Sequence, residues 1–152
     1  MAKDFDLLVG TWDSVQRRLK DYLNGDEWEE FEGVSNFRLL KDGWAHFDEV
    51  EFPAVGTAGL TIRLFDPARE EWSIYWASSR NGQLGLPPVV GKFGPDGVGN
   101  FYSEEQWEGH DIICRYQWSG ITETTARWEQ AFSLDGGKTW KPNWVADFTK
   151  RS

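Results

Sequence analysis

Residues 71–78 read EWSIYWAS, and the spacing of their side chains predicts the fold. Trp72, Ile74 and Trp76 occupy alternate positions along this stretch. Because successive side chains of a β-strand point to opposite faces, a period of two predicts a strand with one face toward a core. Residues 111–118, DIICRYQW, show the same period, so we expect further strands of this kind.

Turn signals rich in glycine, asparagine and aspartate divide the rest of the chain into similar segments. Short connections between them predict an up-and-down antiparallel meander, and closure into a barrel removes the exposed edges of an open sheet. We therefore expect an all-β barrel with room for one small ligand. The expected strands cover residues 11–22, 27–40, 44–53, 57–65, 71–79, 88–93, 99–107, 110–118, 125–133 and 139–149.

Two segments depart from the strand pattern. The N-terminal segment DFDLLVG, residues 4–10, predicts a single helical turn that Asp4 caps and Gly10 ends. The Gly- and Pro-rich segment 81–100 can form either a lid over one barrel end or a stiff crossover between hairpins.

The length of 152 residues predicts a single domain over residues 1–152, which buries about 70% of its unfolded surface. Cys114 is the one cysteine, so no internal disulfide can form, and its apolar surroundings predict a buried side chain. The first residues lack the features of a signal peptide, and no stretch reaches the ~18 apolar residues of a membrane span. We expect a cytoplasmic protein.

Charge and aromatic content restrict the class of partner. The formal net charge is −9, which disfavours nucleic acids and anionic membranes. The chain has 10 tryptophans, 10 phenylalanines and 4 tyrosines, more large rings than the core of so small a domain needs. We therefore expect some of these rings to line a cavity for a small molecule.

The segment SLDGGKTW, residues 133–140, resembles two functional motifs. A phosphate-binding loop needs a glycine where Phe132 stands, so that interpretation fails. The spacing also resembles the Asp-box of sialidases, but one copy is too few for a propeller of about four or more blades. We expect a hairpin tip in which Asp135 binds the turn amides.

The run LVGTW, residues 8–12, followed by a strand meander resembles the calycin superfamily of lipocalins and fatty-acid-binding proteins. Its Gly10-Thr11-Trp12 triplet matches the lipocalin Gly-x-Trp motif, whose tryptophan packs inside the closed end of the barrel. The whole chain also resembles uncharacterised bacterial lipocalin-like domains through runs such as RLFDP, WSIYW and PPVVG. These resemblances imply a barrel with an internal cavity and imply no particular reaction.

The period of two also predicts which side chains face inward. If Trp12 points inward, the same face of its strand carries Ser14, Gln16 and Arg18. We choose the more aromatic face of the other strands, and we place Arg80 over the barrel mouth. The remaining side chains expected inside are Trp44, His46, Asp48, Trp72, Trp76, Ser78, Tyr116, Trp118, Trp128, Gln130 and Trp144.

Several polar residues have a structural as well as a functional interpretation. Arg18 and Asp48 can form an ion pair that neutralises two buried charges, or Arg18 can bind a ligand. His46 can be a hydrogen-bonded structural histidine or a base. Arg115 and Glu129 have the opposite parity, so we expect a cross-strand pair on the outer wall.

Three functional hypotheses follow. The first is a binding protein for a planar or largely apolar molecule, whose polar or anionic end is fixed by Arg18 or Arg80 and by Tyr116. The second, also implied by the calycin resemblance, is a cofactor-free isomerase, cyclase or decarboxylase. In that enzyme His46, polarised by Asp48, moves a proton, and Tyr116 and Arg18 hold a developing oxyanion.

The third hypothesis is haem binding, which needs His46 or His110 as the iron ligand. A structural zinc site is disfavoured because two histidines and one cysteine on separate strands lack the clustered spacing of such a site. We therefore expect neither a cofactor nor a metal. Phe47, Phe65 and Tyr75 are expected on the outside of neighbouring strands, where a homodimer is the simplest way to cover them.

Overall fold

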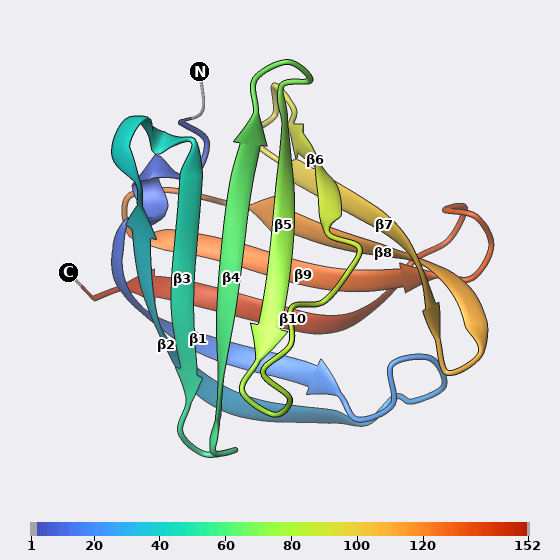
Figure 1. Ribbon diagram of the computed structural model, residues 1–152. Coiled ribbons are helices and arrows are strands. Elements are labelled where there is room, and N and C mark those ends of the chain that lie inside the picture. Colours follow the sequence, from blue (N-terminus) through green and yellow to red (C-terminus); the bar gives the residue numbers. More distant parts are fainter. Residues whose placement is uncertain (1–2, 152) are drawn as a thin grey trace.

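Ten antiparallel strands close into one barrel in the computed structural model, which describes residues 3–151 (Figure 1). Each strand pairs with its neighbours in sequence, and β1 pairs with β10 to close the sheet. This confirms the expected up-and-down barrel. The elements are η1 (Asp6–Leu8), β1 (Gly10–Leu19), β2 (Trp28–Leu39), η2 (Lys41–Gly43), β3 (Ala45–Phe52), β4 (Thr57–Asp66), β5 (Glu71–Ser78), β6 (Val89–Phe93), β7 (Gly99–Trp107), β8 (His110–Ser119), β9 (Thr125–Ser133) and β10 (Lys141–Lys150).

The N-terminal turn η1 covers one end of the barrel, which we call the closed end (Figure 1). Phe5 and Leu8 are buried there, and Trp12 lies beneath them with its indole Nε1 donating to the Leu8 carbonyl at 2.8 Å. The Gly-x-Trp motif therefore has the position that the calycin resemblance implies. Full burial of each such side chain contributes about 1.5–3 kcal/mol to folding.

The predicted cap of the N-terminal turn is wrong. The residue before η1 is Phe5, and no side chain caps the turn. Instead, Asp4 Oδ2 accepts a hydrogen bond of 2.9 Å from the indole Nε1 of Trp72. Asp4 thus ties η1 to the barrel wall, because a buried indole N–H needs an acceptor.

The SLDGGKTW segment forms the predicted hairpin tip between β9 and β10. Asp135 Oδ1 accepts from the amides of Lys138 and Thr139 at 3.1 and 2.9 Å, and Oδ2 accepts from the Thr139 hydroxyl at 2.6 Å. The hydrogen bonds from Thr139 are the main cause that lowers the pKa of Asp135 to about 2. Because Thr139 is held in the turn, β10 begins at Lys141 rather than at residue 139.

The segment 81–100 is part of the wall and does not cover a barrel end as a lid. It contains β6 and the start of β7. Before β6, Leu84 forms a bridge with Ala77, and the Gly85 amide donates to the Trp76 carbonyl at 2.8 Å. The chain therefore runs along the C-terminal part of β5, which β6 does not pair with. This arrangement agrees with the crossover interpretation.

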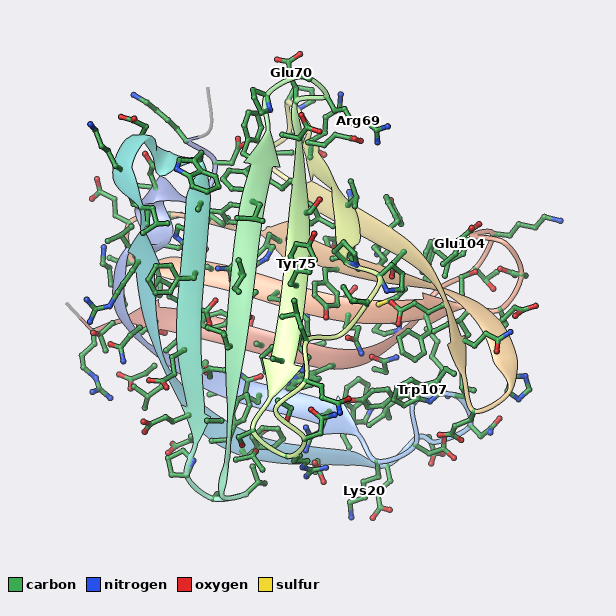
Figure 2. All side chains as sticks on the ribbon, viewed as in Figure 1. Lys20, Arg69, Glu70, Tyr75, Glu104 and Trp107 are labelled. Atoms are coloured by element: carbon green, nitrogen blue, oxygen red, sulfur yellow. The ribbon has the colours of Figure 1, made fainter. Side chains whose placement is uncertain are left out.

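On the outer wall, the Arg115–Glu129 pair is confirmed at 3.2 Å, and Cys114 is buried as expected. Phe47 and Tyr75 lie on either side of Ile62 in the sheet register, on the face opposite to the buried Arg63. Tyr75 is labelled in Figure 2. The prediction for Phe65 is wrong, because its ring packs against Trp72 with centroids 5.2 Å apart. The homodimer stays a prediction.

Within residues 3–151, no helix is long and apolar enough to cross a membrane.

Candidate functional site

A cavity lies in the middle of the barrel, between the closed end and the opposite end. The centres of water-sized molecules can occupy ≈ 80 Å³ of it, within ≈ 590 Å³ of atom-free space that includes open solvent. One water needs about 10–15 Å³ of such volume, so the cavity holds several waters or a small organic group. Its lining consists of Gln16, Ser35, Phe37, Asp48, Val50, Phe52, Thr61, Arg63, Ile74, Trp76, Tyr116, Trp118, Trp128, Gln130, Trp144, Ala146 and Phe148.

Four aromatic rings that line the cavity follow one another, each nearly perpendicular to the next. Tyr116 and Trp128 on neighbouring strands have centroids 5.2 Å apart and an interplanar angle of 78°. Trp144 follows Trp128 at 5.5 Å and 82°, and Trp76 follows Trp144 at 6.1 Å and 83°. We call these four residues the aromatic wall. Perpendicular rings form the corners of a box, and together they present large apolar surfaces to the cavity.

Two features fix the tryptophans of this wall. The indole Nε1 of Trp144 donates to Gln16 Oε1 at 2.8 Å, and Gln16 Nε2 donates to the Ser14 hydroxyl at 2.8 Å. On β4, which pairs with the strand of Trp76, Gly59 lies under the Trp76 ring, and an added Cβ would be 1.9 Å from that ring. Because Gly59 has no side chain, the Trp76 ring can lie against the backbone of β4.

An ion pair that the sequence analysis missed borders the cavity toward the closed end. Arg63, which is 2% exposed, donates from Nη2 to Asp48 Oδ1 at 2.5 Å. Its Nη1 lies 3.0 Å from His46 Nδ1. The guanidinium carbon also lies 5.3–5.5 Å from the rings of Phe5, Phe37 and Trp118. We call Arg63, Asp48 and His46 the buried polar cluster.

One of the two interpretations of Arg18, an ion pair with Asp48, is therefore wrong. Arg18 binds Glu29 instead, with Nε and Nη2 at 3.1 and 2.7 Å from Oε1. Its guanidinium lies between the rings of Phe31 and Trp144, 4.8 Å from each centroid. Arg18 is thus on the predicted face of β1 but is paired at the rim and does not line the cavity.

Burial controls the protonation of the buried polar cluster. Desolvation, and then the charge of Arg63, lower the pKa of His46 to about 2. His46 is therefore neutral, and because arginine can only donate, Nδ1 accepts from Arg63 and Nε2 carries the proton. Within residues 3–151, Nε2 makes no hydrogen bond of normal geometry, and the Phe5 backbone acts on the pKa of His46 in the opposite direction by raising it. Burial raises the pKa of Asp48, and Arg63 acts in the opposite direction.

This geometry bears on the enzymatic hypothesis. His46 and Asp48 each contact Arg63 rather than each other, so Asp48 does not polarise the imidazole. With a pKa of about 2, His46 is also a weak base at neutral pH. Burial raises the pKa of Tyr116 well above its ordinary value, so its hydroxyl stays protonated and can donate in the cavity. The catalytic role of these three residues stays a prediction.

The structure brings most predicted binding residues together. Arg80 is exposed, and Trp44 is 51% exposed at the end of η2, so its predicted inward position is wrong. Trp44 follows the helical turn η2 and precedes β3, so it is not part of a strand and the alternation of strand faces does not apply to it. His110 is exposed at the start of β8, while His46 lies among closed-end rings without lining the cavity. The predicted residues that line the cavity are Gln16, Asp48, Trp76, Tyr116, Trp118, Trp128, Gln130 and Trp144.

Arg63 was missed because β4 has a misleading pattern. Its apolar residues Leu60, Ile62 and Leu64 alternate like a core face, yet Leu60 is 39% exposed and the inward face carries Thr61 and Arg63. The signal that could have found Arg63 is the hairpin register. The turn between β3 and β4 pairs Phe52 with Thr57, and continuing this register places Arg63 opposite His46.

No protein-family model matches the sequence, and no curated protein matches it. Among solved structures, the chain is similar to the S-type phycobiliprotein lyase CPES from Guillardia theta. The TM-score is 0.60 with 8% identity, over 97% of this chain and 90% of the lyase chain. This likeness concerns the fold and supports the calycin-like barrel that the Gly-x-Trp motif predicted. The resemblance to bacterial lipocalin-like domains stays a prediction.

Proposed function

We propose that this protein binds a small, planar or largely apolar molecule with a polar group inside its barrel. The observation that carries the proposal is the aromatic wall. Its rings contact one another, and they also border free space in the barrel. Aromatic lining with a few polar groups is typical of small-molecule sites. A protein with a filled core would instead close this space, because interiors pack at crystal-like density.

The polar groups of the cavity favour a ligand of limited polarity. Asp48 and Arg63 neutralise each other, and both amide atoms of Gln16 are used within the protein. Tyr116 lines the cavity, and burial keeps its hydroxyl protonated. Tyr116 is therefore the residue best placed to bind the polar group of a ligand, beside apolar contacts from the tryptophans.

The test is a titration with nitrobenzyl alcohol, an uncharged planar quencher of indole fluorescence. We expect saturable quenching, because a ligand in this cavity contacts several indoles at once. The variant Ala146→Leu fills the cavity, because Ala146 is 1% exposed and lines it. It should weaken binding by roughly tenfold or more, by occupying the volume that the ligand needs.

The matched control is Ala77→Leu, which adds the same atoms on the opposite parity of β5, outside the cavity. It should leave the quenching curve unchanged. Linear, unsaturable quenching in the wild type, or equal curves for the wild type and Ala146→Leu, would show that the ligand does not enter the barrel.

The enzymatic alternative keeps one point of support. The structurally similar protein from Guillardia theta is described as a lyase, so this barrel architecture is compatible with a reaction. The identity of 8% carries no catalytic residue over to this chain. Any reaction here would depend chiefly on Tyr116, because His46 is enclosed by closed-end rings.

A further inference from the structure

Arg63 is a buried cation at the border of the cavity, and one of its donors is unused. The residue is 2% exposed and belongs to the cavity lining, as does its partner Asp48. Nη2 binds Asp48 and Nη1 binds His46, whereas Nε makes no hydrogen bond of normal geometry within residues 3–151. Because a buried donor without a partner is costly, Nε needs an acceptor from whatever occupies the space beside it.

The neighbours of the guanidinium group restrict the direction from which that acceptor can come. Its central carbon lies 5.3 Å from the ring of Phe5, 5.4 Å from that of Phe37 and 5.5 Å from that of Trp118. These rings offer no strong hydrogen-bond acceptor to Nε. Phe5 belongs to the closed end, whereas Phe37 and Trp118 line the cavity together with Arg63. The cavity is therefore the side from which an acceptor can approach.

The other unused polar atoms of the interior are also donors. In the part of the chain that the structure describes, every buried side-chain nitrogen or oxygen without a hydrogen-bond partner is a nitrogen that donates. One of them is Nδ2 of Asn143, whose Oδ1 accepts from Nε2 of the cavity-lining Gln130 at 2.9 Å. A surplus of donors favours a ligand that accepts hydrogen bonds, because a ligand that only donates would leave these groups unpaired.

The charges at the border of the cavity favour a neutral acceptor over an anionic one. Among the lining residues that the structure describes, Arg63 is the only lysine or arginine, and Asp48 already neutralises its charge. A carboxylate in the cavity would be a second anion beside the same cation. It would lose its hydration without a counter-ion of its own, whereas a carbonyl carries no charge and loses far less.

We propose that the polar group of the ligand is a neutral carbonyl, whose oxygen accepts a hydrogen bond from Arg63 Nε. The inference rests on the proposed binding function and adds Arg63 to Tyr116 as a donor to the ligand. The planar body of the ligand lies against the aromatic wall. Arg63 thus recognises the ligand with the one guanidinium nitrogen that its pairing with Asp48 and His46 leaves free.

The experiment compares three small ligands of nearly equal shape by NMR titration at neutral pH: acetophenone, α-methylstyrene and benzoate. In α-methylstyrene a CH₂ group replaces the carbonyl oxygen of acetophenone. We expect acetophenone to bind roughly tenfold more tightly than α-methylstyrene, because the alkene leaves Nε without an acceptor. Benzoate should bind more weakly than acetophenone, because its charge is buried without a free counter-ion.

The Nε–H resonance of Arg63 reports the proposed hydrogen bond directly. Acetophenone should shift this resonance, and α-methylstyrene should shift it much less. Arg115 is the matched control, because its Nε is also buried without a partner but lies outside the cavity lining. Its resonance should stay in place with both ligands. Arg63→Lys, which keeps the positive charge but has no Nε donor, should remove the preference for acetophenone, and Arg115→Lys should keep it.

Equal binding of acetophenone and α-methylstyrene, or tighter binding of the alkene, would overturn the inference and leave the binding function standing. Tightest binding of benzoate would overturn the choice of a neutral group. An Arg63 resonance that does not move, or that moves no more than that of Arg115, would overturn the role of Nε. Failure of all three ligands to bind would overturn the proposed function itself. The wild-type ranking and resonances decide the inference even if Arg63→Lys does not fold.

Discussion

The closed end and the cavity are both built from aromatic side chains, yet only the cavity has free space. At the closed end, Phe5 packs edge-on against Trp72 and Phe93, and Arg63 fills the remaining centre beneath it. In the cavity, the aromatic wall surrounds a volume that no side chain enters. The difference teaches that aromatic content alone does not predict a binding site. What matters is whether another side chain fills the space between the rings, as Arg63 does at the closed end, or leaves it empty, as in the cavity.

The largest expected effect is a loss of stability when the ion pair near the closed end is broken. Arg63→Met leaves the buried carboxylate of Asp48 without a partner, and we expect the free energy of unfolding to fall by about 3–5 kcal/mol. Urea denaturation measures this change. The double variant Arg63→Met/Asp48→Leu should recover much of the loss, because well-packed apolar residues can replace a buried ion pair.

Arg18→Met is the comparison at the rim of the cavity. Glu29, its partner, has a side chain 34% exposed, so water can solvate the carboxylate after Arg18 is removed. We expect a loss of about 1 kcal/mol or less. Equal losses for Arg63→Met and Arg18→Met would contradict the distinction between a packed closed end and a hydrated rim.

A pair of glycines tests whether the two regions differ in their tolerance of added volume. Gly91 lies between Trp72 and Phe101 at the closed end, and an added Cβ would be 1.9 Å from the backbone oxygen of Asn100. Gly91→Ala should therefore lower the free energy of unfolding by about 1–3 kcal/mol, because the backbone must move.

Gly59→Ala meets the Trp76 ring, which borders free space and can rotate into the cavity. We expect a loss of less than about 1 kcal/mol together with a changed tryptophan fluorescence spectrum and weaker ligand binding. Unfolding in urea and ligand titration distinguish the two variants. A larger loss for Gly59→Ala than for Gly91→Ala would show that the cavity is as rigid as the closed end.

The same contrast explains what the sequence could predict. Strand periodicity predicts all ten strands and places Trp76, Tyr116, Trp128 and Trp144 inside, because the period of two reports the faces of a sheet directly. It does not distinguish an apolar outer face from an inner one. Arg63 was missed for this reason, since its strand has leucines and isoleucine on the outer side.

Pairing is the second feature that periodicity does not predict. Arg18 lies on the predicted face, but its partner is Glu29 on the next strand, directly opposite in the register. Register and side-chain reach together decide such contacts, and one residue of slip exchanges all of them. The sequence therefore predicts the composition of the cavity wall better than its charge.

The last prediction concerns the pH dependence of the closed end. His46 has a pKa of about 2 in the folded protein, below the ordinary value of 6.5, so the unfolded chain binds a proton there that the folded chain does not. Stability from this residue is complete above about pH 6.5 and is lost as the pH falls below that value. The free energy of unfolding should decrease by up to about 1.4 kcal/mol per pH unit between pH 6.5 and 5, above the range in which most carboxylates titrate. His46→Gln should flatten this slope in denaturation experiments, whereas His110→Gln, at an exposed position, should keep it. A wild-type slope near zero would mean that water reaches His46, and that the closed end is not packed as tightly as its rings indicate.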